Sequence, residues 1–463
     1  MTPAFKKERE NLEAAATKLL SLALQAGAES AEVCGSFRQK TKITLEKQDY
    51  HMASADDGYS LGVRVLSGQR QGFASCNTTD LKELKEVALR AVEIAGFSPQ
   101  NPNYRIMASG NIPKEAPSAL WDDSLYQLSL QTQKDWTRLM KDEATKDPRF
   151  RLNEGGVEIA SDLFLITNSH GTHKLEKETV ASWTLMGMAV EGDVITSFDY
   201  FQEISRRASG VPERIVATTK RFRETLAQNL KQGPPRSYKG LVVFTPRAVI
   251  DILLSPLSYH LNGRNVVEKT SKWNLETLGN PVLARELTIR DLPWLTDRTG
   301  CAIFDREGTP TSNQVMIEDG MLRGFLMDQY AAVAMGQKST GHAYGGPSMP
   351  PSVSPHCLCV NGGEEPIAHL IARATTQQKE FLVINRYSGQ VDPVSGDFSG
   401  VAKGGEWWTG GERAYCVKET LISGNIFDAF GESLFGISKE TEIVESAEEC
   451  PTIGVNNVSV TGG

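Results

Sequence analysis

The chain has 463 residues, of which 40% are hydrophobic and 23% are charged, and its net charge is −8 at pH 7. This length exceeds what one ordinary hydrophobic core supports, so two domains are expected. The balance of 49 Lys and Arg against 57 Asp and Glu, without a basic stripe, argues against a nucleic-acid-binding surface. No apolar run approaches the roughly 20 residues that a membrane-spanning helix needs.

The first half of the chain is typical of helices flanking an antiparallel sheet. Apolar spacing predicts a helix that begins near Glu10 and stops at Gly27, and further helices over 81–96, 127–145 and 212–231. Alternating runs predict strands over 42–48 and 60–75, with a hairpin turn at Ser67-Gly68. Short alternating runs over 156–204, broken by "NSHG" and "EGD", predict an antiparallel meander.

The stretch "QGPPRSYKG" (232–240) is the best linker in the sequence, because Gly233, Pro234 and Pro235 stand together in it. We therefore expect domains over 1–232 and 233–463. The second half mixes strands, hairpins turning at 318–320 and 410–411, and helices over 246–261 and 364–378. This order is not a strict βαβ alternation, so both domains are predicted to be α+β, each combining antiparallel sheet with helices.

Seven scattered cysteines indicate free thiols in a reducing compartment, and the cytoplasm is the expected location. The N-terminal 20 residues have no uninterrupted apolar stretch, since Glu8, Glu10 and Glu13 break it. They predict an amphipathic helix and not a signal peptide.

Histidines offer no complete metal-binding pattern. A zinc-protease helix needs two His about one turn apart and a Glu beside the first, but Pro256 and Arg264 stand one turn before and after His260. His260 is therefore interpreted as a structural residue. His170 and His173 share a predicted turn without a third ligand nearby, and metal binding there is disfavoured.

Cysteines and carboxylates give weaker signals. Cys357 and Cys359 lie on one face of a predicted strand and are interpreted as packed side chains. They could be metal ligands only if two further ligands came from elsewhere in the chain. Cys416 lies mid-strand, where reactive thiols are unusual. Asp305 and Glu307 could perform acid–base chemistry, but before Gly308 they more often shape a turn. The stretch 388–400 is expected to be a flexible loop or the lining of a cleft.

Several segments in their order resemble the TldD/PmbA family, whose members have been described as modulators of DNA gyrase. They are "AGAESAEV", "DDGYSLGVRVLSGQRQGFAS", "ITNSHG", "FDREGTPTSNQVMIEDGMLRGFLMDQYAAVAMGQKSTGHA", "SGQVDPVSGDFSG" and "KETLISGNI". In this family, TldD-type subunits are metalloproteases with a zinc-binding HExxxH helix in the second domain. PmbA (TldE)-type subunits share the fold without that motif. The equivalent helix here, Pro246–Leu261, lacks HExxxH, and so does the whole chain, so it resembles the PmbA branch.

The resemblance implies a chain without a metal or catalytic residues of its own, which pairs with a TldD-type subunit that supplies the zinc. The pair would cut unfolded or extended peptides, and Asp305, Glu307, Gly308 and His342 are the candidates for lining the substrate cleft. Two alternatives stay open: an independent hydrolase using Cys416 or the Asp305/Glu307 pair, and a regulatory protein that binds DNA gyrase. A homodimer in place of the two-chain assembly also stays open.

Overall fold

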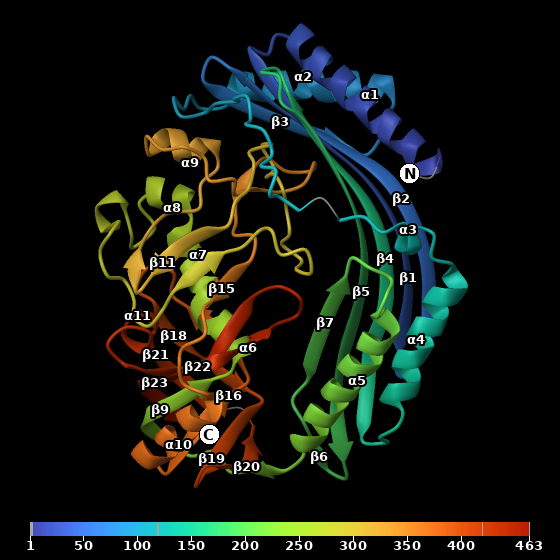
Figure 1. Ribbon diagram of the computed structural model, residues 1–463. Coiled ribbons are helices and arrows are strands. Elements are labelled where there is room, and N and C mark those ends of the chain that lie inside the picture. Colours follow the sequence, from blue (N-terminus) through green and yellow to red (C-terminus); the bar gives the residue numbers. More distant parts are fainter. Residues whose placement is uncertain (1–2, 118–119, 419, 463) are drawn as a thin grey trace.

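The computed structural model describes residues 3–117, 120–418 and 420–462, and two large sheets dominate it (Figure 1). The first sheet has seven strands in the order β3-β2-β1-β4-β5-β6, and β7 also pairs with β5. All of its pairings are antiparallel. Its strands are β1 (Ser30–Glu46), β2 (Asp49–Ser67), β3 (Arg70–Cys76), β4 (Phe150–Asn168), β5 (His173–Glu191), β6 (Val194–Ile195) and β7 (Asp199–Ser205).

The strands of the first sheet are longer than the sequence pattern predicts. The hairpin turn after Ser67 and the meander are confirmed, but β1 begins at Ser30, twelve residues before the expected strand. Between Ala31 and Gly35 consecutive side chains are all buried. Because both faces of the sheet are covered there, the alternation that marks a half-exposed strand is absent.

Helices cover one face of this sheet. They are α1 (Pro3–Gln25), α2 (Leu81–Phe97), α3 (Asp123–Tyr126), α4 (Leu130–Ala144) and α5 (Val211–Gln228). Val33 and Leu163 pack with α1 and α2, while Val157 and Trp183 pack with α4 and α5. Figure 1 shows α1 and α2 along the outer side of the sheet, so its other face is turned toward the second half.

The second sheet has 14 strands, and the longest path through it is β12-β11-β10-β15-β23-β9-β16-β19-β20-β8. The last strand of the chain, β23, pairs with β9, β15, β21 and β22. The bounds on this path are β8 (Gln232–Gly233), β9 (Tyr238–Phe244), β10 (Ile289–Asp291), β11 (Gln314–Glu318), β12 (Met321–Leu322), β15 (Leu358–Val360), β16 (Glu380–Ile384), β19 (Gly405–Thr409), β20 (Glu412–Val417) and β23 (Glu449–Thr461).

Further short elements complete the second half. The remaining strands are β13 (Ala343–Tyr344), β14 (Ser352–Val353), β17 (Arg386–Val391), β18 (Asp397–Lys403), β21 (Thr420–Asn425) and β22 (Leu434–Ile443). The helices are α6 (Pro246–Val249), α7 (Ser255–Leu261), α8 (Gly263–Val267), α9 (Gln329–Ala334), α10 (Ile367–Gln377) and α11 (Ile426–Ala429). The mixture of helices with antiparallel and mixed sheets confirms the predicted α+β class.

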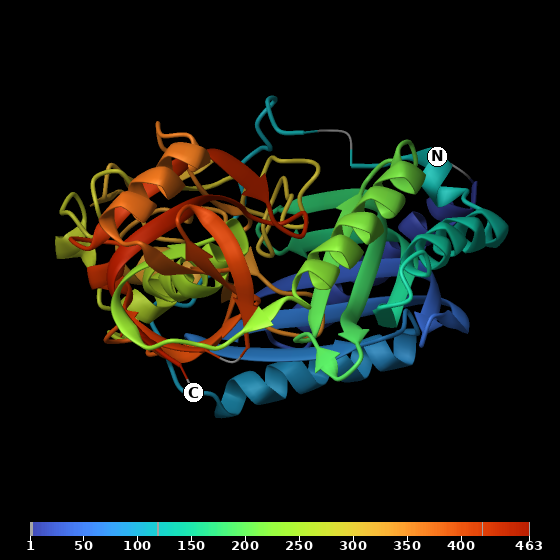
Figure 2. The ribbon, with the colours of Figure 1, turned by 90° about the horizontal axis from the view of Figure 1, so that it is seen from below.

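One helical segment, residues 246–261, lies within the ring that the second sheet forms (Figure 2). Its apolar side packs into the largest core cluster, with Val249, Leu253 and Leu257 fully buried. The segment is not one regular helix, because a π-helical turn, Ile250–Leu254, joins α6 to α7. The wider turn precedes Pro256, whose ring and missing N–H interrupt α-helical hydrogen bonding.

The flexible loop predicted over 388–400 is wrong, whereas the alternative, the lining of a cleft, is not contradicted. Most of it forms the hairpin of β17 and β18, which pair antiparallel from Arg386↔Lys403 to Val391↔Phe398. The hairpins predicted at 318–320 and 410–411 are confirmed. No described helix is long and apolar enough to cross a membrane.

Candidate functional site

A pocket of about 590 Å³ lies where the inner face of the first sheet meets loops of the second half. Even-numbered residues of β1, β4 and β5 point to this face because side chains alternate along a strand. The sheet contributes Ser36, Arg38, 162–164, Glu176 and Glu178, and the second half contributes 299–302, 304–306, 343–345, Pro355 and His356.

The sheet side of the pocket carries partly buried acidic side chains. Burial raises the pKa of Asp162 to about 7 and that of Glu176 to about 8, and Glu178 adds to the effect on Glu176. Arg38 lies 3.5 Å from Asp162 and opposes its shift. Glu178 instead accepts hydrogen bonds from Arg206, at 3.0 and 3.2 Å. The pocket can therefore hold protonated carboxyl groups near neutral pH, which suits proton transfer.

A buried ion-pair network joins the two halves behind this pocket. Glu32 on β1 accepts from Arg64 on β2 at 3.1 Å and from Arg306 at 2.9 Å. Arg64 also lies 2.8 Å from the Glu307 carboxylate. All four side chains are at most 2% exposed. Unpaired charges at such depth would be very costly, so these residues fix the loop 304–309 against the first sheet.

The loop 304–309 is a turn built around Asp305. Asp305 Oδ1 accepts the backbone N–H groups of Glu307 and Thr309 at 2.9 and 2.8 Å, and its Oδ2 accepts the N–H of Ala343 at 3.0 Å. Burial raises the pKa of Asp305 against the effect of these bonds. Gly308 has φ +78°, and a Cβ there would lie 2.8 Å from the Thr172 methyl group. The turn therefore needs glycine at this position.

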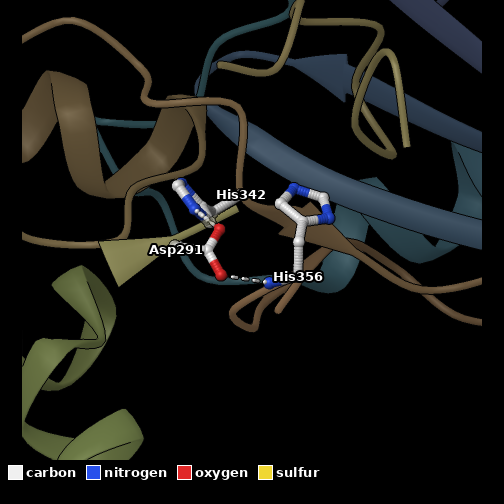
Figure 3. Close-up of side chains that lie close together, drawn as sticks. All are labelled: Asp291, His342 and His356. Carbon is white, nitrogen blue, oxygen red and sulfur yellow. Dashed lines mark hydrogen bonds and ion pairs between the residues drawn. The ribbon is translucent and has the colours of Figure 1, made fainter. Parts of the chain in front are cut away.

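Asp291, His342 and His356 form a polar cluster next to the pocket, in which one candidate ligand atom from each lies within 4.8 Å of the other two (Figure 3). His342 Nε2 lies 2.8 Å from Asp291 Oδ2, and the two imidazole rings are 5.1 Å apart between centroids. Asp291 Oδ1 accepts the N–H groups of His356 and Cys357, at 3.0 and 2.7 Å. Although burial opposes ionisation, the hydrogen bonds from His342 and from the Cys357 N–H hold the pKa of Asp291 below its usual range.

The four cleft candidates predicted from the sequence lie in one region, but they differ in their position relative to the pocket. Asp305 lines the pocket itself. Glu307 and Gly308 lie behind it, where Glu307 Oε2 accepts the Gln329 N–H at 2.8 Å. His342 belongs to the polar cluster and is 1% exposed.

Sequence reasoning missed other members of the site. Glu32, Arg64 and Asp291 lie far from the 305–308 stretch along the chain, and pairing of strands and loops brings them close. His356 could have been considered from the sequence, since only one proline-rich segment separates it from His342.

The histidine and cysteine residues considered in the sequence analysis as possible ligands or nucleophiles lie outside this pocket. His260 is fully buried, its Nδ1 accepts the Lys272 N–H at 3.2 Å, and burial lowers its pKa to about 4. The sulfur atoms of Cys357 and Cys359 are 3.7 Å apart, on one face as predicted. Cys416 is buried on β20, and burial raises its pKa to about 11, which disfavours the nucleophilic thiolate.

Comparison with known proteins identifies the family. Residues 237–462 match a model described as the PmbA/TldA metallopeptidase C-terminal domain, and residues 31–95 match one described as PmbA/TldA metallopeptidase domain 1. Together they cover more than half of the chain. The chain belongs to the PmbA/TldD family.

Individual relatives in the PmbA/TldD family align over nearly the full length. Metalloprotease PmbA of Escherichia coli O157:H7 is 26% identical over 98% of this chain and 97% of its own. An uncharacterized protein of Methanocaldococcus jannaschii is 25% identical over 90% of this chain and 93% of its own. The crystal structure of TldE from Thermococcus kodakarensis has a TM-score of 0.84 at 20% identity, over 97% of this chain and all of its own, which supports the fold.

In this PmbA/TldD family member, the helical segment 246–261 borders a second pocket, of about 520 Å³. Asp251, Ser255 and Tyr259 line it from the helix, four residues apart and hence on one face. Residues 387–389 of β17 line the opposite side. Tyr387 donates its backbone N–H to Asp251 at 3.0 Å, so helix and strand are fixed relative to each other. The two pockets have no lining residue in common.

Proposed function

We propose that this chain is the non-catalytic subunit of a two-chain peptidase, in which an HExxxH-bearing TldD-type partner supplies zinc and cuts unfolded peptides. The observation that carries the proposal is the face of the segment 246–261. Where a zinc-protease helix presents two imidazoles and a carboxylate to the substrate, this face presents Asp251, Ser255 and Tyr259. Its histidine, His260, points instead into a core of Trp273 and Phe427.

Peptide binding is assigned to the pocket between the two halves. Its walls combine the acidic groups of β4 and β5 with the rigid turn at Asp305, and Tyr344 at its edge is 58% exposed. A tyrosine ring beside these carboxyl groups can pack on an extended chain. Glu307, Gly308 and His342 would hold this wall in place from behind.

The first experiment is co-expression of this chain with the HExxxH-bearing homologue from the same genome. We expect a complex with equal numbers of both chains, measured by light scattering after size exclusion, and degradation of an unfolded protein substrate by the complex. Neither the isolated chain nor a complex with the partner's HExxxH glutamate changed to glutamine should cleave. Cleavage by the isolated chain, abolished by Cys416→Ser or Asp305→Asn, would establish an independent hydrolase instead.

The pocket assignment has its own test within that complex. Tyr344→Ala should raise KM for the unfolded substrate several-fold and leave the melting temperature unchanged, because the ring is exposed. Phe97→Ala is the matched control, since Phe97 is 85% exposed on α2, outside the pocket. Equal KM values for the two variants would remove the pocket from the proposal.

A further inference from the structure

We propose that Asp291, His342 and His356 bind a first-row divalent cation, Zn²⁺ in the first instance, within this chain. The site differs from a zinc-protease helix, since its ligands come from three separate segments: the end of β10, the residue before β13, and the loop before β15. The inference departs from the expectation that metal is confined to a partner, and it does not depend on the proposed pairing.

The donor set matches the cation. Two imidazoles and one carboxylate are the ligands that zinc and other first-row divalent metals take in open sites, where a solvent molecule completes the coordination. One donor atom from each residue already lies within 4.8 Å of the others. Figure 3 shows the three side chains gathered at one place, with His342 beside Asp291.

The groups that surround the ligands hold them in place. Asp291 Oδ1 is occupied by two backbone N–H groups, which leaves Oδ2 directed at His342. His342 Nδ1 lies 2.8 Å from Thr340 Oγ1, and His356 Nε2 donates to the Gly341 carbonyl at 2.7 Å. Such outer hydrogen bonds orient metal ligands, and they are complete here.

The hydrogen bonds of His342 show which ring nitrogen faces the carboxylate. In the present arrangement His342 Nε2 carries a proton toward Asp291, because an ionised carboxylate can only accept. For a cation to bind at Nε2, the imidazole would take the other tautomer, with its proton on Nδ1 beside Thr340 Oγ1.

The cluster has an entrance. His356 is partly exposed and lines the 590 Å³ pocket, whereas Asp291 and His342 are almost fully buried behind it. A hydrated cation can reach the ligands through this pocket, whose wall carries Asp162 and Glu176.

The test is equilibrium dialysis of the purified full chain, stripped with a chelator, against Zn²⁺ and against Co²⁺. We expect one ion per chain and visible Co²⁺ absorption of a site with nitrogen ligands. His356→Gln removes one imidazole but keeps an amide that can donate to Gly341, and it should weaken Zn²⁺ affinity at least 100-fold. Zn²⁺ should raise the melting temperature of the wild-type chain and leave that of the variant unchanged.

A double variant at the exposed turn, His170→Gln with His173→Gln, is the matched control, and its affinity should stay within two-fold of wild type. No stoichiometric binding by folded wild-type chain would overturn the inference, and so would unchanged affinity in His356→Gln. A metal-free melting temperature close to wild type verifies that the variant is folded. Pairing with the HExxxH chain, measured separately by light scattering, is expected to be the same in His356→Gln, so the two proposals fail independently.

Discussion

At the residue scale, the junction of the two halves depends on charges that are buried and paired. Glu32 contacts two arginines that come from different parts of the chain, Arg64 in the first sheet and Arg306 in the second half. A buried charge that loses its only counterion is much more costly than an exposed one. Much of the stability of this region therefore depends on Glu32, which lies before the first strand that the sequence pattern predicts.

Glu32→Gln should lower the free energy of unfolding by about 3–5 kcal/mol, because it removes the negative charge between two buried arginines. Chemical denaturation at constant pH measures the loss. Glu318→Gln is the control, since its ion pair with Arg323 is exposed and should contribute at most about 1 kcal/mol. Equal effects of the two substitutions would show that the buried network has no special role.

Glu176 predicts a pH dependence of stability. Its Oε1 is buried without a hydrogen-bond partner among the described residues, and burial raises its pKa from 4.5 to about 8. The folded chain thus binds the proton more tightly than the unfolded chain, so this group's contribution to stability is full below pH 4.5 and is lost as pH rises toward 8.

Glu176→Gln should therefore match wild type near pH 5 and exceed it at pH 9, by about 1–3 kcal/mol. Melting temperatures of both proteins across this range measure the difference. Glu154→Gln on the same sheet is exposed and should give a difference that is constant with pH. A constant difference for Glu176→Gln as well would contradict a buried, protonated carboxyl group.

At the element scale, close approach of backbones fixes the helices on the first sheet. Helix α2 lies so near β3 that a Cβ on Gly72 would be 1.9 Å from the Ala91 carbonyl oxygen. Backbone atoms cannot move aside as the end of a flexible side chain can. The position of α2 is therefore set by the absence of a side chain at one residue of its neighbour.

Gly72→Ala should destabilise the protein by at least about 1–3 kcal/mol, because α2 must shift away from β3. Gly96→Ala is the matched control: it lies in α2, where an added Cβ meets nothing within 4 Å, and it should stabilise by up to about 1 kcal/mol. Thermal unfolding of both variants checks the opposite signs, and a neutral Gly72→Ala would refute the close approach.

The elements also show what the sequence could predict. Periodicity located α2 and α4 to within three residues at either end, because each has one apolar and one polar face. It failed at the β17–β18 hairpin, whose Gly, Ser, Asp and Pro residues are typical of loops. The π-helical turn before Pro256 was also missed, since a widened turn has no periodic signature.

For the site, sequence spacing found Asp305, Glu307 and His342 but interpreted them separately. Asp305 indeed shapes a turn, as its local pattern favoured. The partners Arg64, Asp291 and His356 could not be assigned, because the contacts that matter join residues from 14 to more than 200 positions apart. Such contacts depend on which faces of the two sheets pack against each other, and the local residue pattern does not predict that packing.

At the scale of the whole molecule, the two halves are predicted to unfold together. Besides the ion pairs of Glu32, Arg206 in the first half donates to the carbonyl groups of Thr296 and Arg298 in the second, at 2.9 and 2.7 Å. A Cβ on Gly62 of β2 would lie 1.9 Å from the Pro347 carbonyl oxygen, so the surfaces are in intimate contact. Domains joined in this way share their stability instead of moving independently.

Calorimetry should show one transition whose calorimetric enthalpy equals its van't Hoff enthalpy. In Glu32→Gln, where the junction is weakened, the transition should broaden or split into two. Two well-separated transitions in the wild-type chain would contradict a shared stability.

The position of β23 in the second sheet has a consequence for folding during synthesis. This strand ends at Thr461, yet it lies between β9 and β15 inside the second sheet. A ribosome adds residues in order, so β23 emerges more than 200 residues after β9, with which it pairs. The first sheet can form earlier in synthesis, but the second sheet, including β15 with the loop ahead of it that positions His356, has to wait for β23.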